Sequence, residues 1–578
     1  MADKHAGLLS DLLTFVKDEQ AAGNGKLLDV WNRPIAQKLQ TGWSQAFDRL
    51  ERADELDAVW AFPLDADSRF REGDLLALHG GSPIDDLLAR ELTFESEEDG
   101  RWLLRGKRAP GLLQAYKGGP LFADPDAIDL TQYFERVIQE IGASQIGREI
   151  VLPLLAGDLE ITFTPADYDF GLRAAEARGF NAKQADAVAL AFGANQIACI
   201  QGPPGTGKSS VLALIARLMV DRGERVLVTS HTHMAINNAL NKIHREKAPV
   251  AKIGRPTQRK GLDNAIACLP NFADWADRPA GGYVIGATPF ATCSPRLSSC
   301  EFDAIIFDEA SQVTVPLALM AMRKGQRFVF IGDQRQLPPV MLSRSVLDKN
   351  SMSVFAALTS KHAEHSVMLE QTYRMNRWLT AWPSQTYYAG ELQAAGNNVD
   401  RRLCLTQVPL HLADVFDAQD CGVFIPTRDR SARTQNFRDA ELVADLCAAA
   451  VDGGLAPEEI GIVTPYRAQG RAVRNLLLRR LGRRAAHHVV ADTVERMQGQ
   501  ERELIILSLA TGDEVFLQAV AEFFFQPQRL NVSITRPKTK LIVIGPELSS
   551  VPDVEHSEVR HWIANYIEFL RTLRRIVI

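Results

Sequence analysis

Short apolar segments alternate with amphipathic ones over the last two thirds of the chain, and this alternation limits the fold more than any other feature. The apolar segments are QIACIQG, RVLVTSH, YVIGAT, AIIFDEA and RFVFIGD, followed beyond residue 360 by IGIVTPY, ELIILSLA and KLIVIG. Strands that are apolar along their whole length are buried on both faces, and helices between them produce parallel sheets. The sequence therefore predicts an α/β protein with two parallel sheets, divided between Pro339 and Leu369.

The first 180 residues follow a different pattern. Apolar spacing predicts two helices within residues 1–55, separated by a turn at Gly23 and Gly25. Residues 56–120 hold short apolar runs broken by Gly, Pro and Asp, which favours a strand-rich unit, and helical spacing returns over 121–180. Since 578 residues are enough for several domains of about 150 residues, we assign the two parallel sheets to residues 181–360 and 361–578.

The net charge of −6 conceals an asymmetry. Residues 1–180 hold 19 Lys and Arg against 32 Asp and Glu, so the rest of the chain carries a balance of +7. A positive balance is compatible with a polyanionic partner. The basic stretches 242–260 and 471–484 are candidate nucleic-acid surfaces, and the alternative is that they are merely solvated.

Cysteine spacing and apolar runs predict the compartment. The seven cysteines are scattered without C-x2-C spacing, so we expect buried thiols in a reducing compartment rather than disulfides or a zinc module. The N-terminal residues mix Asp and Lys into their apolar positions, and no run approaches the roughly 20 residues that span a bilayer. We expect no signal peptide and no membrane span, and a location in the cytoplasm or nucleus.

The segment 202–209 (GPPGTGKS) fits the pattern G-x4-G-K-[ST] between a strand and an expected helix, which is the context of a phosphate-binding P-loop. Its backbone N–H groups point at a β-phosphate, Lys208 supplies a cation for the β- and γ-phosphates, and Ser209 offers a hydroxyl to Mg²⁺. The alternative is an incidental glycine-rich turn. We therefore expect ATP and Mg²⁺ as ligands, with the nucleotide held by Gly202, Pro203, Gly205, Thr206, Gly207, Lys208, Ser209 and Ser210.

Two acidic residues end the apolar strand AIIF. At the carboxyl end of a strand, Asp308 can hold Mg²⁺, and Glu309 can orient and deprotonate an attacking water. The alternative is an acidic helix N-terminus, which carboxylates also favour. A P-loop about 100 residues upstream favours the catalytic interpretation.

Five further segments carry a family resemblance: 330–339 (FIGDQRQLPP), 369–375 (LEQTYRM), 463–469 (VTPYRAQ), 494–501 (VERMQGQE) and 530–536 (LNVSITR). With the P-loop and 305–312, they resemble the superfamily 1 helicases, in the DNA2/NAM7-like branch that contains the nonsense-mediated decay helicase and senataxin. The resemblance covers about residues 181–546 in the family's order. It implies two RecA-like P-loop domains in tandem, an N-terminal helical stalk and a small barrel-like accessory domain.

The resemblance also implies residue roles. Gln184 would read the adenine edge, Tyr373 would stack on adenine, and Glu501 would lie near the nucleotide sugar. Gln336 would sense the γ-phosphate. Arg374 and Arg536 would stabilise the charge of the transferred phosphoryl group from the second domain. The alternatives are a solvent-facing helix amide for Gln184, a loop amide for Gln336 and a half-buried core aromatic for Tyr373. For Glu501 the alternative is a salt bridge, and for the two arginines it is surface ion pairs.

Nucleic-acid contacts are expected at Ser230, Thr232, His233, Asn237, Thr288, Pro465, Thr493 and Gln498. A helix cap explains Thr232 equally well. His231 and His233 depart from the Pro-Ser-Asn pattern usual in relatives, and metal binding by the two histidines is a remote alternative. Residues 246–282 are too few for the insertion that relatives carry and are expected to form a basic loop.

These observations predict an ATP-dependent helicase or translocase that moves on single-stranded DNA or RNA, with the family's 5′ to 3′ direction. One alternative is a nucleic-acid-stimulated ATPase that remodels complexes without unwinding. Another is an ATP-gated switch whose protein partner binds the acidic N-terminal region. We expect a monomer that does not bind membranes.

Overall fold

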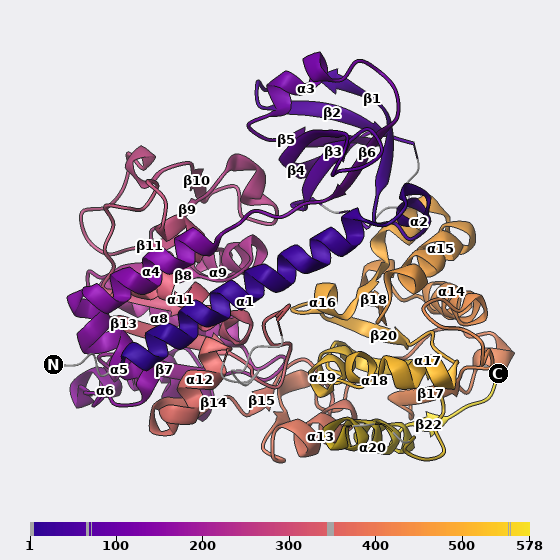
Figure 1. The fold of residues 1–578 in the computed structure, drawn as a ribbon. Coiled ribbons are helices and arrows are strands. Elements are labelled where there is room, and N and C mark those ends of the chain that lie inside the picture. Colours follow the sequence, from indigo (N-terminus) through magenta and orange to yellow (C-terminus); the bar gives the residue numbers. More distant parts are fainter. Residues whose placement is uncertain (1–4, 65–68, 71, 344–351, 553, 555) are drawn as a thin grey trace.

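Three bodies make up the molecule: a small barrel and two domains that each contain a parallel sheet. The computed structural model describes residues 5–64, 69–70, 72–343, 352–552, 554 and 556–578. The two sheet domains lie side by side, and the barrel stands above them at the end of the long helix α1 (Figure 1). This arrangement confirms an α/β protein with two parallel sheets and a small barrel.

The barrel consists of six antiparallel strands in the order β1-β2-β5-β4-β3-β6. Its interior is aromatic, since Phe94 stacks on Trp102 with ring centroids 4.0 Å apart and Phe47 meets the same indole edge-on at 5.4 Å. Closure leaves the sheet without an unpaired edge. The bounds are β1 (Gln45–Arg52), β2 (Ala58–Pro63), β3 (Leu75–His79), β4 (Leu87–Glu98), β5 (Arg101–Arg105) and β6 (Leu121–Pro125), with α3 (Ala109–Ala115) between the last two strands.

The helical prediction for residues 1–55 is correct only at its start. Helix α1 (Ala6–Trp31) continues through Gly23 and Gly25, where a turn was expected, and α2 (Ile35–Gln40) is short. Packing of the α1 apolar face outweighs the cost of roughly 1 kcal/mol for each helical glycine. Residues 45–52 form β1, so their helical assignment is wrong, because burial against the barrel interior decides their conformation.

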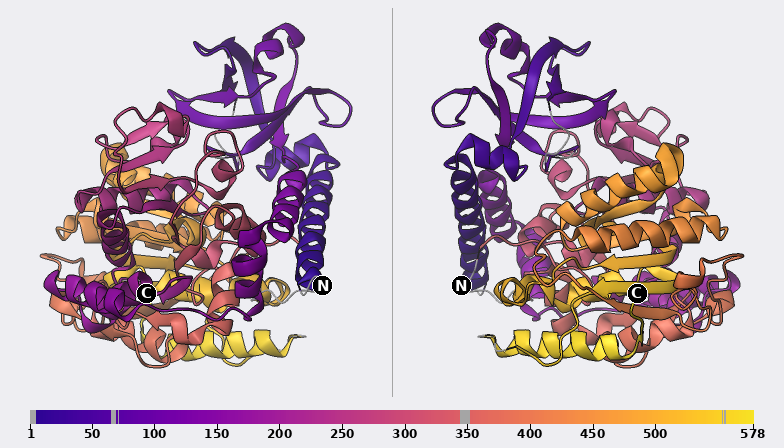
Figure 2. Two further views of the ribbon diagram at one scale, coloured as in Figure 1. Left: turned by 90° about the vertical axis from the view of Figure 1, so that its left-hand side faces the viewer. Right: turned by 90° about the vertical axis from the view of Figure 1, so that its right-hand side faces the viewer.

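Helices carry the chain from the barrel to the first sheet, but residues 121–125 of the segment expected to be helical form β6 instead. These helices are α4 (Thr131–Ala143), a π-helical turn at Gly147–Val151, α5 (Leu152–Ala156) and α6 (Pro165–Ala177). Apolar residues of α1 and α4 pack together on one face of the first sheet. The two helices rise beside each other toward the barrel (Figure 2), so the barrel is connected through a two-helix stalk.

The first domain holds eight parallel strands in the order β10-β9-β11-β8-β12-β13-β7-β14. Apolar side chains of α1, α4, α5, α11 and α12 cover one face, and those of α6, α7, α8 and α9 cover the other. The strands are β7 (Ile197–Gln201), β8 (Arg225–Thr229), β9 (Val250–Ile253), β10 (Ala267–Leu269), β11 (Tyr283–Gly286), β12 (Ala304–Phe307), β13 (Arg327–Gly332) and β14 (Ser366–Met368). The helices are α7 (Ala182–Gly193), α8 (Lys208–Asp221), α9 (His233–Arg245), α10 (Pro289–Thr292), α11 (Val315–Met322) and α12 (Val354–Lys361).

Two sequence expectations for this domain need correction. Residues 246–282 contain β9 and β10, which extend the sheet, so they are more than a basic loop. Lys252 interrupts the apolar pattern of β9 and conceals the strand, although its ammonium is buried and donates to Asn237 Oδ1 at 2.6 Å. The first sheet also extends past residue 360, because β14 pairs with β7.

The second domain holds six parallel strands in the order β19-β18-β20-β21-β17-β22, with a buried apolar cluster on each face. The strands are β17 (Gly422–Pro426), β18 (Ile460–Thr464), β19 (Val490–Thr493), β20 (Arg502–Ser508), β21 (Pro537–Gly545) and β22 (Arg574–Arg575). The helices are α13 (Arg377–Tyr387), α14 (Phe437–Asp452), α15 (Arg467–His488), α16 (Val494–Met497), α17 (Glu514–Ala519), α18 (Ala521–Phe524), α19 (Pro527–Ile534) and α20 (Ser557–Arg571). A short parallel pair, β15 (Gln371–Thr372) and β16 (Gln393–Ala394), lies between the two domains in sequence.

No described helix is both long and apolar enough to cross a membrane. The seven cysteines are unpaired, and most are buried as expected, but Cys404 is exposed.

Candidate functional site

The P-loop connects β7 to α8 in a conformation that requires glycine. Gly205 and Gly207 have φ values of 75° and 85°. A Cβ on Gly205 would lie 2.4 Å from Cβ of Arg374, and a Cβ on Gly207 would lie 2.7 Å from Nε2 of Gln184. Lys208 begins α8, and its ammonium donates to the carbonyl of Gly202. The loop therefore presents a helix N-terminus and a lysine to an anion, and it approaches the second domain closely.

The two predicted acidic residues directly follow β12. Asp308 is 7% exposed; burial, and then the neighbouring charge of Glu309, raise the pKa of Asp308 to about 7, while Lys208 opposes the rise. Glu309 adopts the left-handed conformation with φ of 51°, which a non-glycine residue seldom takes outside constrained sites. Gln498 of the second domain donates to Oε2 of Glu309 at 3.5 Å. The base predicted for the attacking water thus lies where the two domains meet.

Ser209 and Asp308 are the predicted Mg²⁺ ligands, and their chemistry fits that ion. A hydroxyl and a carboxylate are the oxygen ligands that Mg²⁺ prefers. Burial first, and then the charge of Glu309, raise the pKa of Asp308, and a divalent cation bound there would stabilise its ionised form. Elsewhere in the described ranges, no group of three or more His, Cys, Asp or Glu is arranged to hold a metal ion.

Two arginines of the opposite wall are buried and aimed into the cleft by backbone carbonyls. Arg374 donates to Glu501 at 2.7 Å and to the carbonyl of Thr535 at 2.9 Å. Arg536 is 1% exposed, and burial, reinforced by the charge of Arg374, lowers its pKa to about 9. Burial acts to raise the pKa of Glu501, but the ion pair with Arg374 outweighs it and the net shift is downward. An anion between these arginines would relieve their mutual repulsion.

Gln336 connects the two walls. Its amide nitrogen donates to Asp333 Oδ2 at 2.8 Å, and its amide oxygen accepts a long hydrogen bond of 3.5 Å from Arg536. Gln336 follows β13 of the first domain, whereas Arg536 follows α19 of the second. The structure therefore brings together these two residues from different domains.

The predicted adenine-binding residues lie at the edge of the same cleft. Gln184 is buried, caps its own helix in a capping box with Asn181, and donates to the P-loop carbonyl of Thr206 at 2.9 Å. Tyr373 is 40% exposed, and its hydroxyl accepts from Asn181 at 2.9 Å. The backbone N–H of Tyr373 also donates to the carbonyl of Gly205 at 2.9 Å. An exposed ring beside the P-loop is available for stacking.

A cavity of about 410 Å³ joins these groups. Three of its lining residues were not predicted as site residues: Pro204, which lies within the P-loop segment, Gly499, and Lys242, which the sequence analysis noted only as part of a basic stretch. Nothing in the sequence around Lys242 relates it to a nucleotide site, since α9 brings it there through tertiary packing. The lining residues are Pro204, Gly205, Thr206, Gly207, Lys208, Ser209, Ser210, Lys242, Glu309, Gln336, Tyr373, Arg374, Gly499, Glu501 and Arg536. The predicted residues Gly202, Pro203, Gln184 and Asp308 are not among the lining residues.

The residues predicted to contact nucleic acid follow the carboxyl ends of neighbouring strands. Ser230 follows β8 and Thr288 follows β11 in the first sheet, while Pro465 follows β18 and Thr493 ends β19 in the second. Ser230 and Thr493 are buried. The buried Oγ of Ser230 and Oε1 of Gln498 have no hydrogen-bond partner among the described residues. Such atoms call for a partner from outside the chain, because an unpaired buried polar group is costly.

The remaining three candidate nucleic-acid contacts, Thr232, Asn237 and His233, differ in whether their polar groups are free to bind a ligand. The hydroxyl of Thr232 caps α9 by accepting from Ala235 N–H at 3.2 Å, which is the alternative that the sequence left open. Asn237 is 1% exposed and is fully used inside the domain by Lys252 and two loop carbonyls, so it has no group left for a ligand. Burial, and then the charges of Lys252 and Arg296, lower the pKa of His233 to about 4.

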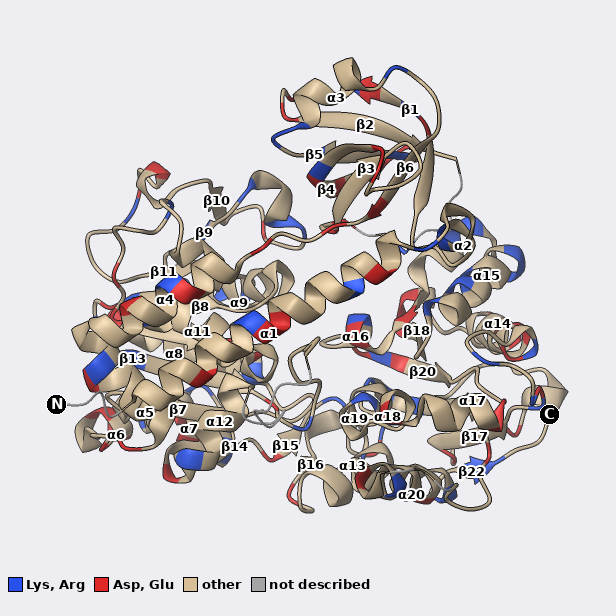
Figure 3. Ribbon diagram, in the orientation of Figure 1, with Lys and Arg blue, Asp and Glu red and all other residues tan. Residues whose placement is uncertain are grey.

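Five arginines meet where the barrel approaches the second domain, and we name this place the arginine crevice. Two adjoining cavities of about 500 and 140 Å³ lie there. Burial, and then the charge of a neighbouring arginine, lower the pKa of Arg69 and of Arg467. Basic residues gather on α15 at this junction (Figure 3). The crevice consists of Arg69, Arg467, Arg471, Arg474 and Arg496.

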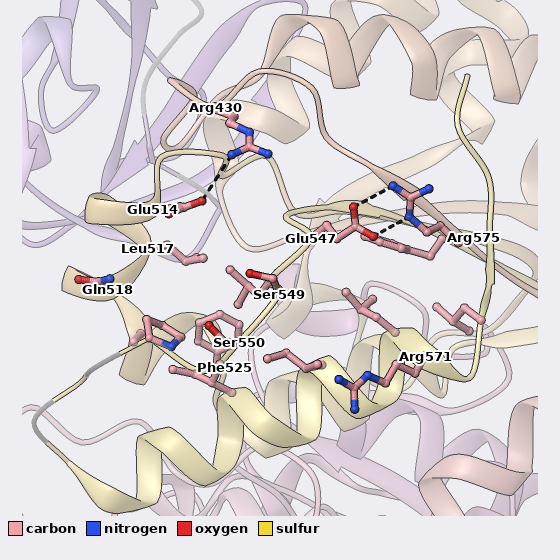
Figure 4. Close-up of a pocket in the computed structure, with 18 residues that line it drawn as sticks. Arg430, Glu514, Leu517, Gln518, Phe525, Glu547, Ser549, Ser550, Arg571 and Arg575 are labelled. Carbon is pink, nitrogen blue, oxygen red and sulfur yellow. Dashed lines mark hydrogen bonds and ion pairs between the residues drawn. The ribbon is translucent and has the colours of Figure 1, made fainter.

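A further cavity, about 600 Å³, lies elsewhere, between the loop after β21 and helices α17, α18 and α20. Figure 4 shows apolar side chains such as Leu517 and Phe525 lining it, with Arg575 facing Glu547 at the rim. None of the predicted site residues lines this cavity.

Comparisons with known proteins match the part of the chain that contains this site. Two family models described as AAA domains match residues 179–402 and 350–548. The DNA replication ATP-dependent helicase/nuclease DNA2 of Saccharomyces cerevisiae is 27% identical over 474 residues, which cover 75% of this chain and 31% of the relative. The human protein of the same name is 28% identical over 412 residues, which cover 65% and 38%. The chain thus spans about a third of the length of these relatives.

A second kind of relative is shorter. The DNA polymerase alpha-associated DNA helicase A of Schizosaccharomyces pombe is 27% identical over 435 residues, which cover 63% of each chain. Among solved structures, the arterivirus nonstructural protein 10 helicase covers 89% of this chain with 14% identity and a TM-score of 0.38. Seven motif segments in the family's order, one joint cleft and relatives named as helicases support the resemblance of this chain to the superfamily 1 helicases, in the DNA2/NAM7-like branch.

Proposed function

We propose that the chain is an ATP-driven motor that moves on single-stranded nucleic acid and unwinds duplexes ahead of it. The observation that carries the proposal is the shared cleft, in which Lys208 and Glu309 of the first domain face Arg374 and Arg536 of the second. Hydrolysis can then be coupled to movement, because the site is complete only while the two domains are together.

The residues divide the chemistry of ATP hydrolysis among them. Lys208 exchanges the carbonyl of Gly202 for the β- and γ-phosphate oxygens, and Glu309 accepts a proton from the attacking water. Arg374 and Arg536 stabilise the charge that spreads over the transferred phosphoryl group. Mg²⁺ held by Ser209 and Asp308 would supply further charge neutralisation at the phosphates.

Nucleic acid is expected to cross the strand ends of both sheets below the barrel. The unpartnered buried oxygen of Ser230 and the strand-end Thr288, Pro465 and Thr493 support this path. The arginine crevice supports it independently, since the five arginines that line one cavity there could pair with phosphates. Relatives named as DNA helicases favour DNA as the track, and the family resemblance favours 5′ to 3′ movement.

The test is ATP turnover with and without single-stranded DNA or RNA of equal length. Glu309→Gln is the inactive variant, and Glu301→Gln, an exposed glutamate that precedes the same strand, is its matched control. We expect stimulation by DNA in the wild type and in the control, and none in Glu309→Gln. Duplexes with a single 5′ or 3′ overhang then test unwinding and direction. Turnover that ignores both polymers would refute the motor.

A further inference from the structure

A buried chain of hydrogen bonds crosses between the two domains beside the ATP cleft. The hydroxyl of Tyr388, which directly follows α13, donates to Asp333 Oδ2 at 2.8 Å. Asn531 of α19 donates from its single amide nitrogen to the hydroxyl oxygen of Tyr388 and to the carbonyl of Arg335, both at 2.8 Å. Tyr388 and Asn531 belong to the second domain, whereas Asp333 and Arg335 belong to the first. These bonds therefore tie the two domains together.

Water is excluded from this contact. Asp333 is 1% exposed, Tyr388 2% and Asn531 0%. Hydrogen bonds to a buried carboxylate are strong, and removing one leaves a polar group that solvent cannot satisfy. The contact is therefore specific to one relative placement of the two domains.

Asp333 connects the relative placement of the two domains to the geometry of the ATP site. The same oxygen that accepts from Tyr388 also accepts from the amide nitrogen of Gln336 at 2.8 Å. An amide whose nitrogen is held in this way must present its oxygen on the other side, where Arg536 donates to it. The orientation of Gln336 thus depends on a carboxylate that the second domain itself holds.

We propose that Tyr388 is a positioning residue that, through Asp333, fixes the Gln336 amide against Arg536 when the domains close. The proposal rests on the proposed function, because it explains how domain placement is communicated to the γ-phosphate side of the cleft. Tyr388 is not among the residues that line the ATP cavity. Its hydrogen bond therefore affects the rate of ATP hydrolysis and does not change the geometry of the P-loop or of the residues at the adenine edge.

The test compares Tyr388→Phe with Tyr387→Phe. The neighbouring Tyr387 is also buried, and within the described residues its hydroxyl makes none of these cross-domain bonds, so its variant controls for loss of a buried tyrosine hydroxyl from the same segment. We expect the kcat of ATP hydrolysis to fall roughly ten-fold in Tyr388→Phe, with the KM for ATP within about two-fold of the wild type. The control should retain the wild-type kcat.

A double-mutant cycle with Gln336→Ala separates positioning from general weakening. If Tyr388 acts through Gln336, adding Tyr388→Phe to Gln336→Ala causes no further loss of kcat. Independent, multiplicative losses, or equal kcat in the two tyrosine variants, would overturn the proposal. The kcat values of the cycle are measured both without and with nucleic acid. If nucleic acid does not stimulate turnover in the wild type, the motor is refuted. The cycle measured without nucleic acid still tests the role of Tyr388.

Discussion

Replacing Glu19 by alanine should release the loop that follows Pro339 from helix α1. The carboxylate of Glu19 accepts from the backbone N–H of Leu342 at 2.9 Å and of Ser343 at 2.7 Å, and also from the Ser343 hydroxyl. The loop continues from the segment that contains Gln336. Glu19 therefore connects the stalk of the barrel to the ATP site, and alanine removes every one of these acceptors.

The size of the effect follows from the bonds lost. Taking about 1 kcal/mol for each of the two backbone hydrogen bonds, as is appropriate for partly exposed groups, gives about 2 kcal/mol of local stabilisation. Since about 1.4 kcal/mol corresponds to a factor of ten, the two amides should exchange with solvent roughly 30-fold faster in the variant. Global stability should change little, because the loop can open without the core.

Amide hydrogen exchange of Leu342 and Ser343 is the direct assay. Glu19→Gln keeps one carbonyl acceptor and should lie between the wild type and Glu19→Ala. Asp11→Ala removes an exposed carboxylate from the same helix and should leave both amides as protected as in the wild type. If Glu19→Ala and Asp11→Ala exchange at equal rates, the carboxylate does not hold the loop.

Three further outcomes are expected. Asp124→Asn leaves the buried ammonium of Lys38 without its ion-pair partner, which should cost about 3–5 kcal/mol and lower the temperature at which the barrel unfolds; an unchanged melting curve would contradict this. Gly205→Ala places a Cβ at φ of 75° and 2.4 Å from Cβ of Arg374, so kcat/KM for ATP should fall at least about ten-fold in steady-state assays, and unchanged kinetics would be inconsistent with that crowding. A pKa of about 4 keeps His233 neutral from pH 6 to 8. The wild type and His233→Asn should therefore show the same pH dependence of nucleic-acid affinity over that range. Tighter binding at pH 6 in the wild type alone would show that the imidazole is charged there.

Local sequence was sufficient for the nucleotide side of the site. The P-loop occupies one continuous segment between a fully apolar strand and a helix, and Asp308 and Glu309 follow a strand of the same kind. Parallel strands place such strand ends at one edge of the sheet, so their meeting could be predicted without knowing the packing. The same reasoning located both sheets.

Packing decided what the sequence could not show. Residues 45–52 have apolar positions that fit a helix, but they become β1 because the barrel needs a sixth strand to close. Tyr388 and Asn531 were missed because their partners lie 55 and 143 residues away along the chain. No local pattern distinguishes a tyrosine that bonds across domains from one that fills a core, as the adjacent Tyr387 illustrates.

Exposure of the contacts between the domains indicates which of them yield when the cleft opens. Tyr373 meets Asn181 at the surface, where water can replace the lost hydrogen bond at little cost. The bond from Tyr388 to Asp333 has no such replacement, because both residues are buried. Opening should therefore begin at the adenine edge, so that nucleotide exchange needs less separation of the domains than release of Gln336 from Arg536 does.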